Sequence, residues 1–425
     1  MQKAAFLLFL FLTTGVGKMA AQQNPDKTYQ QQIQTILVHP QGDPLGDPVI
    51  NLNGGTPLQI SFDDFGATYE DYYYTIELAD SIWQPTDLNE FDYIKGFNLN
   101  KIMTYEVSSI AAKPYFHYQF TFPNSNCSPR LSGNYILKVY NGSGKETLMF
   151  TRRIYVVESL VGIMASVENP FDAKIARTHQ RIKAGVDVKN VPYFQQDRIA
   201  LKVVQNYRYQ DAQTVAIPSF IRNTLLEYNN EAQLLFGAGK EYRWLDLQSL
   251  RLRSDRVAAI DSRENTPIIT VKTDITRADL LHEIYKDVNG GYLIMNTESL
   301  KSESQNDYAQ VVFTYLPKDG KPFLDKRVYL SGALTNNALD AGAEMQFDVK
   351  KGMYTKTLLL KQGYYSYQYI LVDRIEPDPM EEYTDTEGNH WETENKYSLF
   401  VYYRAPGTRN DQIIGFASIN SKNSW

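Results

Sequence analysis

Hydrophobic and polar residues alternate in many short stretches along the chain. Tyrosine, phenylalanine and β-branched residues fill these stretches, and glycine, proline, asparagine and aspartate separate them. A period of two residues is typical of strands that bury one face. The pattern predicts an all-β protein made of tandem immunoglobulin-like or early-set β-sandwich domains. The clearest predicted strands are Tyr72–Leu78, Tyr115–Phe122, Tyr135–Tyr140, Arg153–Val157, Ala200–Gln205, Ala309–Leu316, Thr357–Leu360, Tyr364–Val372 and Tyr397–Tyr403.

Helical periodicity is scarce. Ala278–Lys286 favours a helix of one or two turns, with Asp274 or Thr276 as its cap. The stretch Asn141–Gly144 instead predicts the turn of a β-hairpin, because its glycines adopt positive φ without a steric penalty.

The first residues have the layout of a secretory signal peptide. Lys3 supplies a positive charge, and Ala4–Leu12 forms an apolar run. Met19–Ala21 then offers small residues for cleavage before Gln22. The apolar run is too short to cross ~30 Å of hydrocarbon as a helix, and the absence of a cysteine near the cleavage point excludes a lipoprotein anchor. We expect residues 1–21 to be removed and the mature protein to be secreted.

Turn-forming and polar runs divide the expected mature chain into three units. The first spans residues 22–158 and ends after the predicted hairpin. The second, a β-rich unit, spans 159–302, and the third, an early-set-like sandwich, spans 303–404. The polar run 296–307 is expected to link the last two units, and residues 405–425 are expected to form a polar tail.

Charge and cysteine content narrow the function classes. The net charge is −6 with acidic and basic residues intermixed, so the chain lacks the basic stripe that nucleic-acid phosphates require. Cys127 is the single cysteine, and stability must therefore come from full-sized hydrophobic cores without a disulfide. Because Cys127 lies in the polar stretch Asn124–Pro129, we interpret it as an unreactive loop residue.

Motifs for catalysis or metal binding are weak. His282–Lys286 resembles the zinc-protease pattern HExxH, but lysine replaces the second histidine and its ammonium group would repel Zn²⁺. The five histidines are far apart in the sequence, and a GxSxG elbow, a phosphate loop and a dinucleotide fingerprint are all missing. These observations favour a protein without enzymatic activity, cofactor or metal.

Residues 373–394 are the most acidic part of the chain, with nine carboxylates against Arg374 and His390. Oxygen ligands on a loop suit Ca²⁺, but the spacing of an EF-hand is absent. We expect a solvated acidic hairpin loop and leave calcium binding open.

Residues 327–372 follow the rhythm of starch-binding early-set domains. Those modules carry an exposed tryptophan that stacks on sugar rings. Thr335–Asn337 stands at that place here, so we expect the fold without the sugar site.

Several segments occur in a characteristic order: Tyr72–Trp83, Phe91–Asn98, Tyr105–Glu106, Pro114–Pro123, Ser132–Glu158, Val204–Arg208, Phe236–Asp246, Asp287–Tyr292, Asp307–Tyr308, Leu360–Tyr367, Glu387–Arg404 and Asp411–Gly415. In this order they are similar to the plug protein family of the type IX secretion system of Bacteroidetes. The resemblance implies a soluble periplasmic protein, peripheral to the outer membrane, that docks on a very large outer-membrane β-barrel translocon and occludes its periplasmic opening. It implies no catalytic residue, no cofactor, no nucleic-acid partner and no small-molecule substrate.

Tyrosine is abundant, with 31 residues, and its ring suits both a strand surface and a protein interface. We predict partner contacts from the tyrosine-rich strands, with these candidates: Tyr72, Tyr74, Tyr364, Tyr365 and Tyr367. Alternation puts Tyr72 and Tyr74 on one face, but the sequence leaves open whether that face is core or contact surface. Two other classes stay open. An envelope glycan-binding protein would present two or more exposed coplanar aromatic rings. A carbohydrate-active enzyme would place two carboxylates roughly 5–10 Å apart in a cleft.

Overall fold

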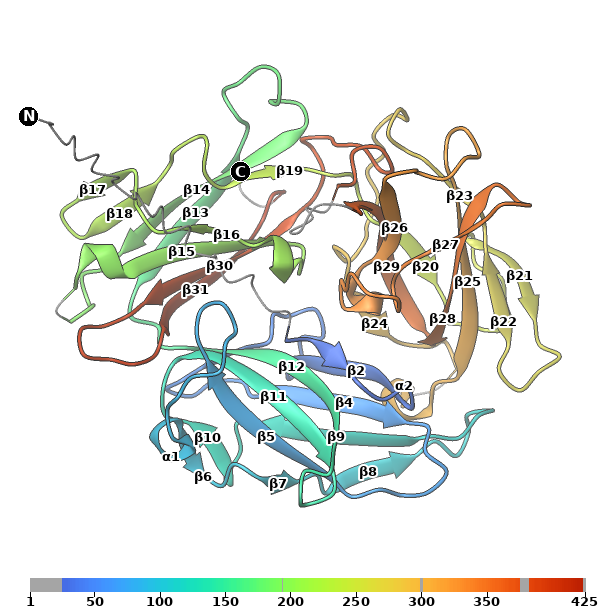
Figure 1. The fold of residues 1–425 in the computed structure, drawn as a ribbon, viewed down its shortest axis with the longest axis horizontal. Helices are drawn as coiled ribbons and strands as arrows, with labels where there is room; N and C mark the ends of the chain where they lie inside the picture. Colours follow the sequence, from blue (N-terminus) through green and yellow to red (C-terminus); the bar gives the residue numbers. More distant parts are fainter. Residues whose placement is uncertain (1–24, 193, 299–300, 375–381, 423–425) are drawn as a thin grey trace, which may run out of the picture.

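The computed structural model describes residues 25–192, 194–298, 301–374 and 382–422. The predicted signal peptide, residues 1–21, lies outside the described residues. Strands make up nearly all of the regular structure, so the all-β prediction is confirmed. Three sandwich units surround a common centre, with the first below, the second at the upper left and the third at the right of Figure 1.

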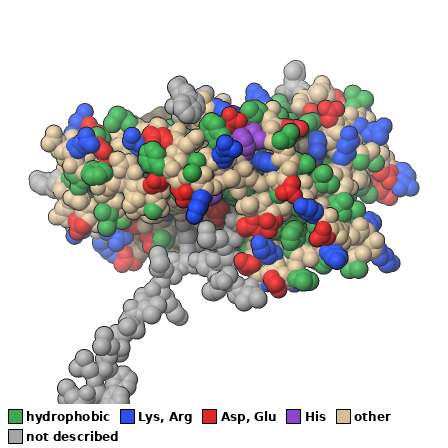
Figure 2. Space-filling view, turned by 90° about the horizontal axis from the view of Figure 1, so that it is seen from above, with side chains coloured by type: hydrophobic (Ala, Val, Ile, Leu, Met, Phe, Trp, Pro, Cys, Tyr) green, Lys and Arg blue, Asp and Glu red, His purple; other side chains and the backbone are tan. Residues whose placement is uncertain are grey.

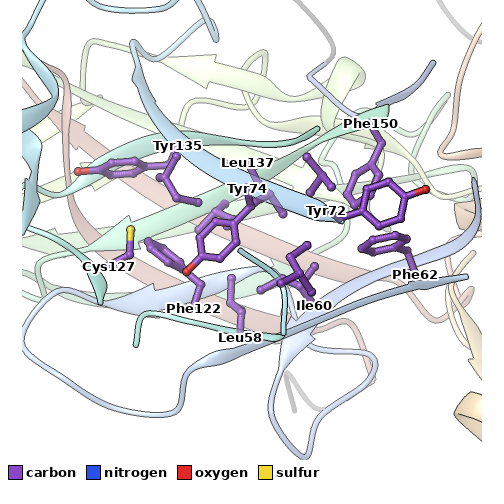
Figure 3. Close-up of a cluster of buried hydrophobic side chains, with 14 of the residues drawn as sticks. Leu58, Ile60, Phe62, Tyr72, Tyr74, Phe122, Cys127, Tyr135, Leu137 and Phe150 are labelled. Carbon is purple, nitrogen blue, oxygen red and sulfur yellow. The ribbon is translucent and has the colours of Figure 1, made fainter. Parts of the chain in front are cut away.

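The first unit packs two sheets face to face. Leu58, Ile60 and Phe62 project from one sheet, and Tyr72 and Tyr74 project from the other (Figure 3). The alternation in β4 and β5 produces this core, because every second side chain of a strand points the same way. One sheet contains β5 (Tyr72–Ala79), β7 (Asn100–Lys101), β11 (Gly133–Asn141) and β12 (Thr147–Val157), with β1 (Lys27–Thr28) and β3 (Val49–Asn51) paired to β12. The facing sheet contains β2 (Ile33–Pro40), β4 (Leu58–Asp64), β9 (Phe116–Phe122) and β8 (Thr104–Val107), and β6 (Ile94–Gly96) pairs separately with β10 (Cys127–Pro129).

The predicted hairpin of the first unit is confirmed. Strand β11 pairs antiparallel with β12. Gly142 has a φ of +79° in the connection, a backbone conformation that glycine adopts without a Cβ clash.

The second unit combines strands from two distant parts of the chain. Its core packs Ile182 and Val186 of β14 against Leu201 of β15 and Leu399 of β30. One sheet contains β13 (Gly162–Glu168), β14 (His179–Asp187), β17 (Phe220–Arg222), β18 (Leu225–Tyr228) and β19 (Leu235–Gly237). The other contains β15 (Ile199–Gln205), β16 (Gln213–Val215), β30 (Lys396–Tyr403) and β31 (Gln412–Asn420).

The third unit is inserted into the second, between β19 and β30. Its core joins Phe313 and Tyr315 of β25 to Tyr367 and Tyr369 of β29. One sheet contains β20 (Arg243–Asp246), β24 (Tyr292–Ile294), β26 (Lys326–Ser331) and β29 (Gly363–Asp373). The other contains β21 (Val257–Asp261), β22 (Ile268–Val271), β23 (Asp274–Ile275), β25 (Tyr308–Leu316), β27 (Gln346–Asp348) and β28 (Met353–Lys361).

One sheet runs through both the first and the second unit, in the order β16-β15-β30-β31-β12-β11-β5-β7. The two units meet where β31 lies parallel to β12, with Val157 opposite Ile413. A separate hydrophobic cluster packs against this junction and contains residues of both units: Ala79, Trp83, Ile136, Tyr155, Val157, Val204, Tyr209, Phe400, Tyr402 and Ile413. The first two units therefore share a continuous sheet and a hydrophobic cluster at their junction.

Strand pairing corrects the expected division of the later chain. Strand β20 pairs with β29, so residues near 243 belong to the third unit although we expected them in the second. Strand β30 pairs with β15, and residues 412–420 of the expected polar tail form the central strand β31. These pairings join residues that are far apart in the sequence. The local polarity of a segment does not indicate which distant strand it pairs with.

The expected linker at 296–307 is docked against the first unit rather than free. It contains α2 (Ser302–Gln305), and the Ser304 hydroxyl donates to Glu106 at 2.8 Å. Tyr115 donates to the carbonyl of Asn306 at 2.8 Å. The connection thus forms part of the contact between the first and third units.

The predicted helix at Ala278–Lys286 is wrong, since this segment has no helical turns in the structure. Thr276, the expected cap, donates its hydroxyl hydrogen to the carbonyl of Asp385 at 2.7 Å instead. Lys240 Nζ donates to the carbonyl of Leu280 at 2.7 Å, so tertiary contacts replace helical hydrogen bonds. Within the described ranges the other α-helix is α1 (Glu90–Tyr93), and no helix there is long and apolar enough to cross a membrane.

Candidate functional site

Tyr72 and Tyr74, two of the predicted partner contacts, lie in the core of the first unit (Figure 3). The Tyr72 hydroxyl donates to Asp64 at 2.8 Å. The Tyr74 ring stacks on Phe120 with ring centres 4.5 Å apart, and its hydroxyl accepts a hydrogen bond from Asn124 at 2.7 Å. Their shared face is therefore the buried one, and they do not offer their rings to a partner.

In β29, Tyr365 and Tyr367 are likewise buried in the core of the third unit. Tyr367 donates to Asp274 at 2.8 Å. Tyr364 points the other way, is only half-buried, and lies parallel to Trp244 of the neighbouring strand with ring centres 6.3 Å apart. Of the five candidates, the contact role of Tyr364 alone stays a prediction.

The acidic segment 373–394 is not simply a solvated loop, because Glu387 is buried. Its carboxylate accepts from Arg243 Nε at 3.0 Å and from Arg277 Nε at 2.7 Å. Burial raises the pKa of Glu387, but the two arginines reverse this and lower it to about 2. Arg243 also pairs with the buried Asp274 at 2.8 Å. This network is a structural ion cluster inside the third unit.

Calcium binding by the acidic segment gains no support from the part of it that is described. Across the described ranges, no group of three or more histidine, cysteine, aspartate or glutamate side chains is arranged to hold a metal ion. Residues 375–381 lie outside those ranges.

His282, from the HExxH-like pattern, has its ring buried at 6% exposure. The ring stacks on His390, with centres 4.2 Å apart and planes 8° apart, and Nε2 lies 3.9 Å from Glu241. Burial and the neighbouring His390 lower the pKa of His282 to about 4, while burial raises the pKa of Glu241 to about 8. The two histidines are more than 100 residues apart in the sequence, so spacing gave no signal of this pair.

Cys127 is a core residue and not a loop residue as expected. It lies in β10, opposite Gly96 of β6, and is fully buried. Burial raises the pKa of its thiol to about 12. Low reactivity of the Cys127 thiol therefore stays a prediction, but its physical reason is exclusion from solvent.

Exposed apolar side chains gather along one edge of the first unit. Seven residues between Phe91 and Ile110 are 39–75% exposed, and they lie in or next to α1, β6, β7 and β8, which follow one another along the lower edge of Figure 1. We call them the apolar rim: Phe91, Phe97, Leu99, Met103, Tyr105, Val107 and Ile110. By contrast, Figure 2 views the molecule from the opposite, upper side, where hydrophobic side chains are scattered among charged ones. The apolar rim is thus a row of exposed apolar side chains along one segment of the first unit, and exposed apolar residues that gather on a surface are candidates for an interaction site.

Polar contacts join the second unit to the first and to the third. Asp47 of the first unit accepts from Lys396 and Ser398 of the second, both at 2.9 Å. Gln210 of the second unit donates to the carbonyl of Asn337 in the third at 2.8 Å. Contacts of this kind make the three sandwiches one body.

The described chain thus consists of three sandwiches in mutual contact, with an apolar rim on the first. Residues 33–158, which make up most of the first unit, match the family model described as "Type 9 secretion system plug protein 1st domain", so this unit belongs to the plug protein family of the type IX secretion system. This match ends at the residue where the first unit was expected to end.

A solved structure extends the likeness to almost the whole chain. A hypothetical protein from Parabacteroides merdae ATCC 43184 is 30% identical, and the alignment covers 93% of this chain and 98% of that chain with a TM-score of 0.88. No curated protein matches the chain.

Proposed function

We propose that this protein is a non-enzymatic periplasmic subunit that docks on the outer-membrane β-barrel translocon of the type IX secretion system and occludes its periplasmic opening. The observation that carries the proposal is the match of residues 33–158 to the plug family. The fold supports it, since a plug must hold its shape while it covers an opening. A sheet shared between two units and buried polar contacts between all three supply that rigidity.

The apolar rim is our proposed docking surface. It lies within the segment that matches the family, and it includes Phe97 and Met103, which are 75% and 74% exposed. Aromatic residues and methionine are enriched in protein interfaces, where a few of them contribute most of the binding free energy. Nearby charges of both signs, such as Lys95 and Glu106, provide a polar surround that suits reversible association.

Affinity purification of the tagged protein from native membranes, followed by mass spectrometry, tests the proposal. The unmodified protein should recover a very large outer-membrane β-barrel. Failure to recover such a barrel would overturn the translocon assignment.

Paired variants test the docking surface separately. Phe97→Asp with Met103→Asp should lose most of the recovered barrel, because two anionic groups would be desolvated in the interface. Leu281→Asp with Ile284→Asp is the matched control, since these third-unit residues are 91% and 64% exposed and lie outside the apolar rim. Equal recovery with both double variants would exclude the rim as the docking surface.

A glycan-binding role is the second candidate, favoured by the parallel rings of Trp244 and Tyr364. Both rings are half-buried on the outer face of one sheet, and aligned aromatic rings provide a surface for sugars. Affinity electrophoresis in envelope polysaccharide should then show retardation that Trp244→Ala abolishes. Equal mobility of the two proteins would remove this candidate.

A further inference from the structure

A cavity of about 150 Å³ lies where the three units meet, beside a larger hollow of about 700 Å³. The two share lining residues from the first and third units: Asp26, Ile36, Arg152, Tyr292, Ala333 and Asn336. Tyr207 of the second unit completes the smaller cavity. Ligand sites form preferentially at domain junctions, and a cavity of about 150 Å³ admits a molecule of roughly the size of benzene.

Arg152 of β12 lies on both cavities and is itself only 7% exposed. Its Nη1 donates to the carbonyls of Lys27 at 3.1 Å and Thr151 at 2.7 Å, and Nη2 donates to the hydroxyl of Thr28 at 3.2 Å. All three acceptors are neutral. Arg152 forms no ion pair within the described ranges, and the nearby Asp26, which pairs with Arg153 at 2.6 Å, offsets only part of the cost of burying the Arg152 charge, so the pKa of Arg152 is lowered.

These contacts leave two donors of the guanidinium group without an acceptor among the described residues, Nε–H and one hydrogen of Nη2. The two nitrogens belong to one planar fork, whose spacing matches the two oxygens of a carboxylate. Removing a cation from water costs free energy, and a well-placed anionic partner offsets this cost. The charged residues that line the smaller cavity also favour an anion. Arg152 and Arg153 lie there with one acidic residue, Asp26.

Tyr292 brings a further donor from the third unit. Its ring stacks on Tyr365, with centres 5.3 Å apart and planes 19° apart, and its hydroxyl forms no hydrogen bond within the part of the chain that is described. Burial raises the pKa of Tyr292 to about 12, although the nearby Arg152 opposes the rise. The hydroxyl therefore keeps its proton at neutral pH and is able to donate it in a hydrogen bond.

We propose that this junction binds a small carboxylate, with the Arg152 fork donating to both oxygens and the Tyr292 hydroxyl donating a third hydrogen bond. Apolar walls from Ile36 and Pro44 suit a short carbon chain beside the carboxylate. A doubly charged phosphate fits less well, since the cavity supplies one surplus positive charge. The site is separate from the apolar rim and does not depend on docking to the translocon.

Isothermal titration calorimetry of the full mature protein tests the site with sodium acetate, propionate and succinate, against phosphate and sulfate, at constant ionic strength set with chloride. Saturable binding of at least one carboxylate is expected. Arg152→Gln should weaken it about tenfold or more, because charge-assisted hydrogen bonds are lost. Tyr292→Phe should weaken it about threefold to tenfold through loss of one neutral hydrogen bond. Arg251→Gln is the control, since Arg251 is highly exposed in the third unit and should leave the affinity unchanged.

The absence of saturable carboxylate binding, or unchanged affinity in folded Arg152→Gln, would overturn the proposal. Tighter binding of phosphate than of every carboxylate would overturn the carboxylate assignment. If Arg152→Gln does not fold, Tyr292→Phe decides, because it removes one oxygen atom: reduced affinity supports the site and unchanged affinity refutes it.

Discussion

Lys361 of the third unit forms an ion pair with Asp63 of the first, and both side chains are 1% exposed. The Asp63 carboxylate also accepts hydrogen bonds from His117 Nδ1 at 2.6 Å and from the Tyr308 hydroxyl. Burial opposes ionisation of Asp63, but Lys361 and His117 together hold its pKa below the usual value. Tyr115 places its ring 4.5 Å from the Lys361 ammonium. The interface between two sandwiches therefore depends on a polar cluster that is satisfied only when the units are docked.

Lys361→Met should destabilise the protein by about 3–5 kcal/mol, because it leaves the Asp63 charge buried without its main partner. The measurement is the urea concentration at which the protein unfolds, followed by tryptophan fluorescence and circular dichroism. If the fluorescence transition and the circular-dichroism transition occur at different urea concentrations, the units unfold one after another.

Lys318→Met provides the matched control for that variant. Lys318 pairs with Asp279 at 2.7 Å, but both side chains are 74% exposed, and exposed ion pairs add little to stability. The midpoint of this control should not change measurably. Equal midpoints for Lys361→Met and Lys318→Met would contradict the importance of the buried pair.

The low pKa of Glu387 predicts that the protein loses stability in acid. Its folded pKa of about 2 lies below its ordinary value of 4.5, so its contribution is present above pH 4.5 and is lost as the pH falls toward 2. Urea midpoints between pH 6 and pH 2.5 should therefore fall, and Glu387→Gln should show a shallower fall. Glu387→Gln should also cost about 3–5 kcal/mol at neutral pH, since Arg243 and Arg277 lose their shared carboxylate. A parallel pH dependence in the two proteins would contradict this account.

The raised pKa of Glu241 predicts that the protein loses stability as the pH becomes alkaline. Its folded pKa of about 8 lies above the ordinary 4.5, so the stability it contributes as a neutral group is lost as the pH rises through 8. Glu241→Gln keeps an acceptor for the Glu394 amide and avoids the buried charge. At pH 9 it should be more stable than the unmodified protein by a few kcal/mol, because the folded pKa is raised from 4.5 to about 8 and one pKa unit equals about 1.4 kcal/mol. At pH 5 the two should match, and a gain of the same size at pH 5 would exclude titration of Glu241 as the cause.

The strands were predictable because alternation is a local property. The predicted Tyr72–Leu78 is β5 (Tyr72–Ala79), and the predicted Tyr364–Val372 lies within β29 (Gly363–Asp373). Alternation also put Tyr72 and Tyr74 on one face, but which face is buried depends on the sheet that packs against it. That packing partner, β4 with β9, is not encoded in β5 itself.

The polar clusters were not predictable from the sequence, because their members come from segments that are far apart along the chain. Arg152 gains its cavity from residues that follow it by 140 positions or more, such as Tyr292 and Asn336. The sequence around Glu387 predicts a solvated acidic loop. The fold, however, places Arg243 of the distant strand β20 beside the Glu387 carboxylate. Sequence reveals charge density, and only the fold reveals whether an opposite charge is close.

Cys127 should not react with a thiol reagent while the protein is folded. It is 0% exposed, and burial raises its pKa to about 12, so the reactive thiolate is scarce at pH 8. Labelling with 5,5′-dithiobis(2-nitrobenzoic acid) should be slow in buffer and complete within minutes in 6 M guanidinium chloride, where denaturation exposes the thiol. Rapid labelling in buffer would show that β10 opens readily from β6.

Removal of residues 405–425 should unfold the second unit, although local polarity predicts only a polar tail there. Strand β31 pairs with β30 on one side and touches β12 on the other. Its Ile414 is buried in the core of the second unit, and its Ile413 in the cluster shared with the first. Loss of a central strand removes more than the ~5–15 kcal/mol net stability of a typical domain, and the unpaired edges of β30 and β12 promote aggregation. A chain that ends at residue 422 keeps all of β31 and is the control. Limited proteolysis should degrade the second unit of the shorter chain rapidly while the control resists, and equal resistance of the two chains would refute the assignment of β31 as a structural strand.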